Sequence, residues 1–284
     1  MWRRHDGFSG RPGWRISSIN ANAWANEMSA VCELETSEDA FLGGRLQIKQ
    51  PVRGHRAGID AVMLAASAPI DMGDGSRFLD AGCGSGVVGL CVASRSTKTG
   101  VVGVDIEPRL VALANQNARQ NGLAARATFI SGDVSAPLAD LRDLGLVENS
   151  FDHVLANPPF HDARRNRSSP VALRREASSM APGELERWLR LFAAVTKPSG
   201  SVTLVHRADA LSALLTVMSG RFGGITIFPL FPRDGAPAKR LLIRGTKGSR
   251  APLVLAHGLV LHDRDGQFTP RAEAILRHGG GLCI

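Results

Sequence analysis

Short apolar runs alternate with helix-forming stretches between residues 59 and 246, and this alternation limits the folds open to the chain. Consecutive parallel strands need a long crossover, which a helix usually supplies. We therefore predict an α/β fold with a seven-stranded, mostly parallel sheet and helices on both faces. The predicted strands are 77–81, 101–106, 127–131, 151–156, 201–206, 224–231 and 240–246, and the predicted helices are 59–68, 87–95, 108–121, 185–195 and 209–219.

The last two predicted strands and the two ends of the chain depart from this alternation. Residues 232–239 leave no room for a helix, so we expect a hairpin that makes one edge strand antiparallel. Residues 1–27 show no sustained period, and residues 1–37 are expected to form a disordered arm, with Met28 as an alternative start. Residues 38–284 are expected to form a single domain. Its accessory edges are an N-terminal hairpin and helix over 41–68 and C-terminal strands over 224–262, with a terminal hairpin after 253.

Composition excludes several classes of protein. No stretch approaches the ~20 consecutive apolar residues of a membrane helix. The four cysteines, Cys32, Cys83, Cys91 and Cys283, form no CxxC pair and no regular spacing. This pattern argues against a zinc site or a disulfide framework and favours a reducing cytoplasm. We therefore expect no membrane span and no metal.

A glycine-rich turn follows the strand 77–81, where residues 80–86 read DAGCGSG. Glycines at a strand-to-helix turn let a ligand lie against the backbone, so Gly82, Gly84 and Gly86 are candidate cofactor residues. Residues 84–89 also satisfy the GxGxxG pattern of dinucleotide sites, which is weak alone. Asp80 favours S-adenosylmethionine, because a carboxylate there would bind the ammonium group or steady the loop, whereas a pyrophosphate prefers positive or neutral surroundings.

Acidic residues follow the next two predicted strands. Asp105 lies 21 residues beyond Gly84 and is suited to accept hydrogen bonds from two ribose hydroxyls. Glu107 is an alternative for this role, or favours the helix that begins at Pro108. Asp133 follows 127–131 and is placed to accept from an adenine amine, or to cap the next helix.

The fourth strand of the alternation ends in Asn157-Pro158-Pro159-Phe160. Two prolines end the strand and stiffen the loop. The Asn157 side-chain oxygen and the Pro158 carbonyl would accept the two hydrogens of an exocyclic amine and favour the pyramidal geometry that frees its lone pair. Phe160 would stack on the base, and Pro159 would also contact the substrate. The tetrad therefore predicts methylation of a planar amine, with Asn157, Pro158 and Phe160 as the catalytic group.

Basic residues flank a slightly acidic centre, and the chain carries a net charge of +8. Residues 161–180 hold five basic and two acidic residues, and 221–250 hold seven basic and one acidic. This distribution favours a polyanionic partner, although a solvated surface would give it too. The candidate phosphate contacts are Arg56, Arg164, Arg165, Arg175, Lys239 and Arg240.

Together, DAGCGSG, GVDIEP, SGDV and NPPF resemble the class I S-adenosylmethionine-dependent methyltransferases, which have a Rossmann-like fold. Residues 54–62 (GHRAGIDAV) and the stretch beginning FPLFPRDGAPAK are similar to the bacterial tRNA(Val) adenine-37 N6-methyltransferases, α-proteobacterial type. The resemblance covers about residues 38–284. It implies a tRNA substrate and places Gly58 and Asp60 near the methionine end of the cofactor. Members often carry Tyr in place of Phe160, a change that preserves stacking but not a hydroxyl contact.

Other functions remain open on the residues alone. An NPP tetrad also suits the glutamine amide of a protein, and it suits adenine N6 or guanine N2 in rRNA or DNA. A nicotinamide-dependent oxidoreductase, or a plain nucleotide-binding module, fits the glycine turn but not the NPPF tetrad. We expect a cytoplasmic monomer that methylates adenine N6 in tRNA.

Overall fold

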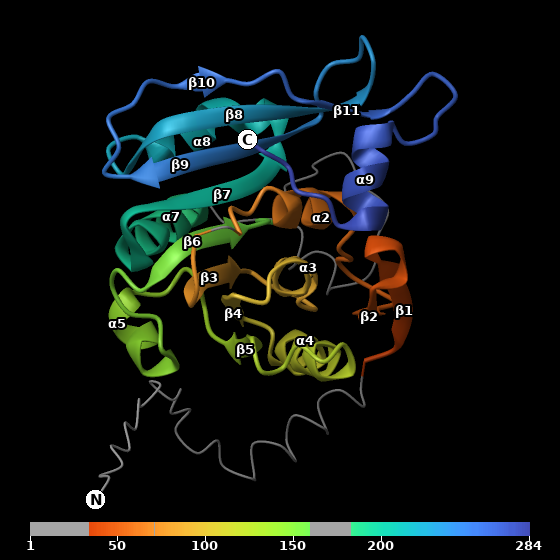
Figure 1. Ribbon diagram of the computed structural model, residues 1–284. Helices are drawn as coiled ribbons and strands as arrows, with labels where there is room; N and C mark the ends of the chain where they lie inside the picture. Colours follow the sequence, from red (N-terminus) through yellow and green to blue (C-terminus); the bar gives the residue numbers. More distant parts are fainter. Residues whose placement is uncertain (1–33, 71, 160–182) are drawn as a thin grey trace, which may run out of the picture.

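The computed structural model describes residues 34–70, 72–159 and 183–284, in which one large sheet separates two groups of helices (Figure 1). Its strands and helices are β1 (Thr36–Phe41), β2 (Leu46–Pro51), α2 (Ile59–Ala66), β3 (Ser76–Ala81), α3 (Val87–Arg95), β4 (Thr99–Asp105), α4 (Pro108–Gln120), β5 (Ala127–Ser131), α5 (Leu138–Leu141), β6 (Phe151–Ala156), α7 (Glu184–Val195), β7 (Thr196–Arg207), α8 (Leu211–Met218), β8 (Phe222–Arg233), β9 (Arg240–Lys247), β10 (Val254–Leu255), β11 (Leu259–His262) and α9 (Pro270–His278). Short 3-10 turns are η1 (Leu42–Gly44), η2 (Arg142–Leu144) and η3 (Ala208–Ala210).

The large sheet confirms the predicted α/β class and differs in two details. Its strand order is β10-β8-β9-β7-β6-β3-β4-β5, with β11 also paired to β8. The antiparallel strand β9 lies between β7 and β8, so it is not an edge strand as expected. β7 and β8 run parallel to each other, are connected through α8 and lie one strand apart. The short connection after β8 places β9 between them, antiparallel to both.

The chain after β9 adds strands to the sheet in place of the expected terminal hairpin. β10 and β11 both pair with β8 in parallel, at Val254↔Thr226 and Leu259↔Leu230. A single antiparallel bridge, between His262 and Phe268, is what remains of the expected hairpin. The sheet therefore has nine strands within the described residues.

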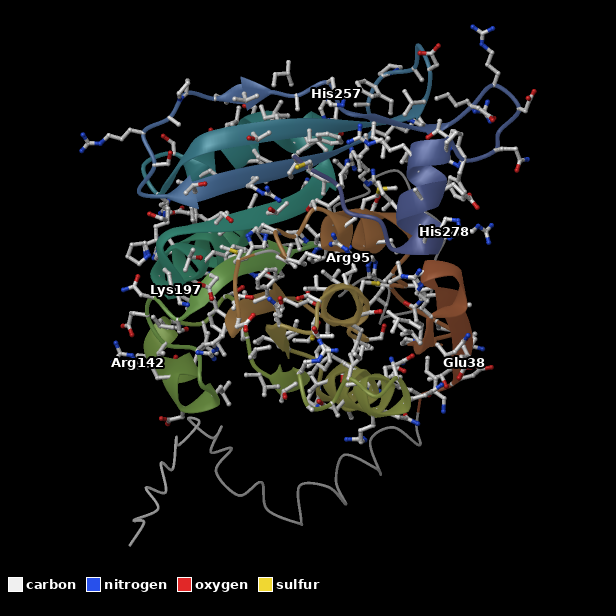
Figure 2. All side chains as sticks on the ribbon, in the orientation of Figure 1. Glu38, Arg95, Arg142, Lys197, His257 and His278 are labelled. Atoms are coloured by element: carbon white, nitrogen blue, oxygen red, sulfur yellow. The ribbon has the colours of Figure 1, made fainter. Side chains whose placement is uncertain are left out.

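Helices cover both faces of the sheet as predicted. α2, α3, α4 and α9 bury one apolar cluster with residues such as Leu90 and Phe129, and α5, α7 and α8 bury another around Phe151 and Phe192. Charged side chains such as Glu38, Arg142 and Lys197 project from the periphery (Figure 2). No helix in these described ranges is long and apolar enough to cross a membrane.

The N-terminal hairpin is longer than the sequence pattern indicates. β1 begins at Thr36, two residues inside the expected arm, because its register with β2 runs from Thr36↔Pro51 to Phe41↔Leu46. Arg56 reinforces this extension, since its guanidinium donates to the Ser37 hydroxyl at 2.7 Å and to the Pro51 carbonyl at 2.8 Å. The hairpin packs beside α4, outside the large sheet (Figure 1).

The parallel strands place the candidate site at one edge of the sheet. β3, β4, β5, β6 and β7 run in the same direction, so their carboxyl ends meet there. Asp80 is in register with Gly103, and Ala81 with Ala156. The glycine turn, Asp105, Asp133 and Asn157 therefore share one rim.

Candidate active site

The glycine turn joins β3 to α3, and its three glycines differ in what a side chain at their position would contact. Gly82, Gly84 and Gly86 have φ values of 71°, 54° and 85°. A Cβ on Gly82 would lie 2.8 Å from the Trp188 ring, and one on Gly86 would lie 2.9 Å from Phe129. A Cβ on Gly84 would meet nothing within 4 Å in the described structure. Packing therefore requires the outer two glycines, and Gly84 leaves open space beside the loop.

Asp105 holds the turn from the end of β4. Its Oδ2 accepts the Gly84 N–H at 2.8 Å, and its Oδ1 accepts the Glu107 N–H at 3.0 Å. Burial raises the pKa of Asp105, and these two N–H groups act in the opposite direction. A carboxylate oxygen can accept more than one hydrogen bond, so Asp105 retains capacity for a ligand.

Ile106 and Glu107, which follow Asp105, differ in their contacts. Glu107 caps α4, because it accepts from the Arg109 N–H at 3.3 Å and from the Arg109 Nε at 2.8 Å. Its carboxylate is therefore engaged with the helix, which was the alternative to a ribose contact. Ile106 is 68% exposed beside Asp105. Ile106 was not among the expected site residues, although an apolar residue between two acids at a strand end is a usable signal.

Asp80 faces the start of α3. It is 1% exposed, and its Oδ2 accepts the Gly89 N–H at 2.8 Å. Burial raises the pKa of Asp80 to about 7, and the Gly89 N–H partly opposes this effect. Of its two expected roles, the structure shows contact with the helix that follows the loop, and the ammonium contact stays a prediction.

Asp133 lies beyond β5 and is exposed. Its Oδ1 accepts the Ser135 N–H at 2.7 Å in a local turn. The Ser135 hydroxyl in turn accepts from the Trp188 indole at 3.0 Å. Trp188 thus connects this turn to Gly82, against which its ring packs.

Asn157 follows β6 at the same rim and carries a buried amide oxygen. This Oδ1 has no hydrogen-bond partner among the described residues. Leaving a buried acceptor unpaired costs about 1–3 kcal/mol, so the Asn157 oxygen has capacity for a donor outside the described residues. Pro158 is buried and Pro159 is half-buried. Phe160 lies outside the described residues.

Asp60, on α2, forms an ion pair with a residue at the start of β9. Asp60 accepts through Oδ2 from the Arg240 Nε at 2.9 Å, which joins α2 to the start of β9. His55 interacts electrostatically with both Asp60 and Asp105. The pKa of His55 is lowered overall, because the effect of burial exceeds the opposite effect of the two carboxylates. A Cβ on Gly58 would meet nothing within 4 Å. His55 was not among the expected cofactor residues.

The basic candidates separate in the structure. Lys239 is exposed at the rim, and Arg240 pairs with Asp60. Arg56 is bound within the hairpin, where the Asp39 carboxylate accepts from its guanidinium at 2.5 Å. Arg164, Arg165 and Arg175 lie outside the described residues. The region 247–250 is at the opposite edge of the sheet, because Lys247 pairs in register with Phe222, the first residue of β8.

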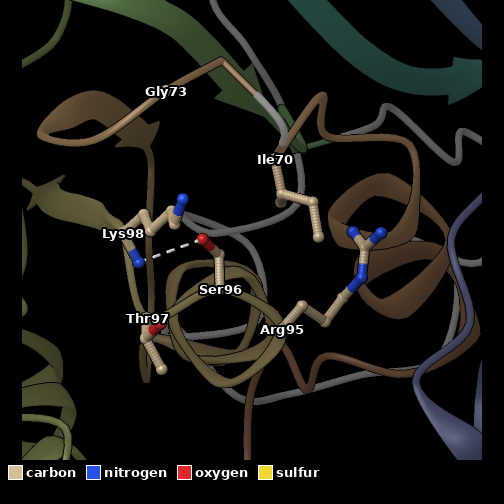
Figure 3. A pocket seen from close by; sticks show the side chains of 6 residues that line it. All are labelled: Ile70, Gly73, Arg95, Ser96, Thr97 and Lys98. Atoms are coloured by element: carbon tan, nitrogen blue, oxygen red, sulfur yellow. Dashed lines mark hydrogen bonds between the residues drawn. The ribbon is translucent and has the colours of Figure 1, made fainter.

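Other features of the described ranges do not add to this rim. These ranges contain no group of three or more His, Cys, Asp or Glu residues that could hold a metal ion. A cavity of about 330 Å³ lies at the far end of α3, lined by Ile70, Gly73, Arg95, Ser96, Thr97 and Lys98 (Figure 3). The Lys98 N–H donates to the Ser96 hydroxyl there at 3.2 Å.

Comparison with known proteins finds similar methyltransferases. Residues 61–180 match the model of the methyltransferase small domain family. The chain is 26% identical over 221 residues to the tRNA1(Val) (adenine(37)-N6)-methyltransferase of Dyadobacter fermentans, covering 77% of this chain and 87% of that enzyme. It is 29% identical over 180 residues to the release factor glutamine methyltransferase of Moorella thermoacetica, and this match spans 61% of each chain.

A solved structure supports the fold. The crystal structure of a predicted O-methyltransferase from Agrobacterium tumefaciens superposes with a TM-score of 0.67 at 26% sequence identity. The match covers 79% of this chain and 99% of that one. The similarity extends beyond the glycine turn to most of the sheet.

Proposed function

We propose, from the membership of residues 61–180 in the methyltransferase small domain family, that the chain transfers a methyl group from S-adenosylmethionine to the N6 amine of adenine in tRNA. The observation that carries this proposal is the buried Asn157 Oδ1, which lacks a partner among the described residues. It lies at the carboxyl edge of the sheet, directly after β6, the strand that pairs with β3. A methyl acceptor with an N–H group would satisfy it.

The rim also fits the cofactor. The open space at Gly84 allows a ligand to approach the backbone, and Asp105 beside it has acceptor capacity for ribose hydroxyls. Ile106 offers an exposed apolar surface for the flat adenine ring. Asp60, Gly58 and Asp80 are proposed for the methionine end, and Asp133 for the adenine amine.

S-adenosylmethionine supplies an electrophilic methyl group when bound. The residues of this chain would orient the nucleophile. Asn157 and the Pro158 carbonyl would accept the two N–H bonds of the target amine, and these bonds strengthen as the nitrogen becomes pyramidal and more acidic. Phe160 would hold the base flat, with Pro159 beside it. Positioning of this kind accounts for a large part of the rate in such transfers.

The tRNA substrate, and adenine 37 within it, are supported by the relative from Dyadobacter fermentans. Lys239 at the rim and the arginine-rich segment 161–180, with Arg164, Arg165 and Arg175, are proposed to contact phosphates. Arg56 and Arg240 have intramolecular partners and would serve the site indirectly. We further propose that residues 38–284 act as one catalytic domain, as a cytoplasmic monomer.

A second candidate is methylation of a glutamine amide in a protein. It is favoured by the similarity to the enzyme of Moorella thermoacetica, and the Asn157 oxygen would accept an amide N–H equally well. Phe160 and the clustered arginines favour a nucleic-acid base instead. Adenine or guanine in rRNA or DNA is a third target compatible with the same chemistry.

The deciding experiment compares modified nucleosides in total tRNA from cells with and without this protein, by mass spectrometry. We expect N6-methyladenosine in tRNA to fall when the protein is removed and to return with the intact chain, but not with Asn157→Ala. An unchanged tRNA profile with loss of methylglutamine in a release factor would establish the second candidate instead.

A further inference from the structure

Two asparagines of α4, and a third that caps its carboxyl end, pair through their side-chain amides with the backbone of neighbouring strands. Asn115 accepts the Phe129 N–H at 3.0 Å and donates to the Phe129 carbonyl at 2.8 Å. Asn117 makes the same two bonds with Lys49, each at 2.9 Å, and Asn121 makes them with Gln47 at 2.9 and 2.8 Å. Each amide thus acts as a short strand partner. Two of the three fasten β2, and with it the N-terminal hairpin, to α4.

Asn117 makes one bond that the others lack. Its Nδ2 also donates to the Ser85 carbonyl, at 3.0 Å, in the middle of the glycine turn. The third bond of Asn121 goes to the Asn117 carbonyl, in the last turn of α4. Asn117 is completely buried, so water does not substitute for its bonds. One side chain therefore joins the hairpin, α4 and the candidate cofactor loop.

The turn is held by side chains from two different elements. Asp105, at the end of β4, accepts the N–H of Gly84, and Asn117, from α4, donates to the carbonyl of Ser85. Ser85 stands between two glycines with positive φ, which have wide conformational freedom when nothing restrains them. Two anchors on adjacent residues fix the peptide groups that border the open space at Gly84.

We propose that Asn117 is a positioning residue for S-adenosylmethionine, which preorganises the glycine turn without touching the cofactor. This inference rests on the proposed function of that turn. A loop that is already ordered loses less conformational entropy when its ligand binds. Because the same amide also holds Lys49, correct docking of the hairpin and correct shape of the turn depend on one group.

The test compares Asn117→Ala with Asn121→Ala, using S-adenosylhomocysteine as the probe in calorimetric titrations of the full chain. Each substitution removes one side-chain acceptor bond and two donor bonds, and two of the three bonds fasten β2 in both cases. Both variants should lose thermal stability. We expect the Kd for the probe to rise about tenfold in Asn117→Ala, the effect of one buried hydrogen bond, and to stay within about twofold in Asn121→Ala.

Turnover gives a second readout. In Asn117→Ala the KM for S-adenosylmethionine should rise while the KM for tRNA is unchanged, whereas a merely structural defect lowers the amount of active enzyme and leaves both KM values alone. Should Asn117→Ala fail to fold, Asn117→Ser places an uncharged hydroxyl in the same buried site, one bond shorter than the amide that reaches the Ser85 carbonyl. The same rise in Kd is expected for it.

Two results would overturn the inference. Equal loss of affinity in Asn117→Ala and Asn121→Ala would assign the effect to hairpin docking, and unchanged affinity in both would show that the Ser85 bond is dispensable. If the unsubstituted chain does not bind S-adenosylhomocysteine, the proposed function itself fails. Tight binding by the unsubstituted chain with no difference between variants would overturn the inference alone.

Discussion

At the residue scale, the most informative atom is the side-chain oxygen of Asn157. Leaving a buried acceptor without a partner costs free energy, and in our proposal this oxygen gains its partner when an amine enters the site. An interaction made mainly in the transition state affects kcat more than KM. We therefore expect Asn157→Ala to lower kcat on tRNA by on the order of 10²–10³, the effect of losing one positioned hydrogen-bonding group.

Binding of S-adenosylhomocysteine, measured by calorimetry, is the control for this substitution. It should be unchanged, because the Asp105 anchor and the open space at Gly84 do not involve Asn157. Near-normal turnover by Asn157→Ala would contradict the amine-methylation mechanism.

Asp105 should be required for cofactor affinity rather than for turnover alone. Its carboxylate anchors the Gly84 N–H and is the acceptor for the ribose in our proposal. Asp105→Ala should reduce affinity for S-adenosylhomocysteine by about 1.5–3 kcal/mol, the range for hydrogen bonds to a charged group. Glu107→Ala is the matched control: it removes the α4 cap and lowers the melting temperature, but affinity should persist. Equal affinity losses in the two variants would refute a specific role for Asp105.

The raised pKa of Asp80 predicts how the stability of the folded chain changes with pH. Burial raises the pKa of its carboxyl to about 7 in the folded chain, above its ordinary value, so the folded state retains a proton that the unfolded state has lost. The contribution of Asp80 is therefore most favourable at low pH, and it declines as pH rises through about 7. Asp80→Asn keeps an acceptor for the Gly89 N–H and carries no charge.

Denaturant unfolding of Asp80→Asn and the unsubstituted chain should consequently diverge with pH. The variant should gain stability relative to the unsubstituted chain between about pH 4 and 7, by a few kcal/mol in order of magnitude. Comparing the two chains removes the opposite trend of His206, whose pKa burial lowers to about 4. A constant difference between the two chains across that interval would disprove the effect.

At the element scale, the basic segments should act on RNA and not on the cofactor. Reversing Arg164, Arg165 and Arg167 to Glu should raise the KM for tRNA and make the salt dependence of binding shallower, because fewer phosphate contacts release fewer counterions. Cofactor affinity should be unaffected. The control reverses Lys98 and Arg250, exposed cations at the amino edge of the sheet. An unchanged salt slope in the triple variant would make these arginines ordinary surface charges.

The elements also explain why the basic segments separate. The basic residues of 221–250 lie on two sides of the sheet, because β9 runs antiparallel between β7 and β8. Its first residues, with Arg240, therefore reach the rim, and its last residue, Lys247, reaches the other edge. There the Lys247 ammonium donates to the Thr196 carbonyl at 2.8 Å.

At the scale of the whole molecule, ligand binding should stabilise the fold selectively. A ligand that binds only the folded chain adds stability according to its concentration relative to Kd, about 2.7 kcal/mol at 100 times Kd. S-adenosylhomocysteine should raise the melting temperature of the full chain in a concentration-dependent way, and NAD at equal concentration should not. Stabilisation by NAD alone would favour the oxidoreductase alternative.

Local sequence determined the type and order of most elements. The helix 87–95 and the strands 127–131 and 151–156 agree with α3, β5 and β6 to the residue, because apolar periodicity, glycine and proline act over a few neighbouring residues. The same local signals placed Asp105, Asp133 and Asn157 at strand ends, and parallel pairing then brings those ends to one rim. The identity of the fold and the main candidate residues follow from this reasoning.

Tertiary structure decided the features that depend on residues far apart in the chain. The position of β9, the parallel additions of β10 and β11, and the engagement of Arg56 with Asp39 all need partners whose place no local pattern specifies. The sequence does not distinguish Gly82 from Gly84. Only the fold shows that Trp188, about a hundred residues away, packs against Gly82 and leaves no room for a side chain there. Asn117 reads as an ordinary helix residue, and its bonds to Lys49 and Ser85 exist because three separate segments converge on one buried amide.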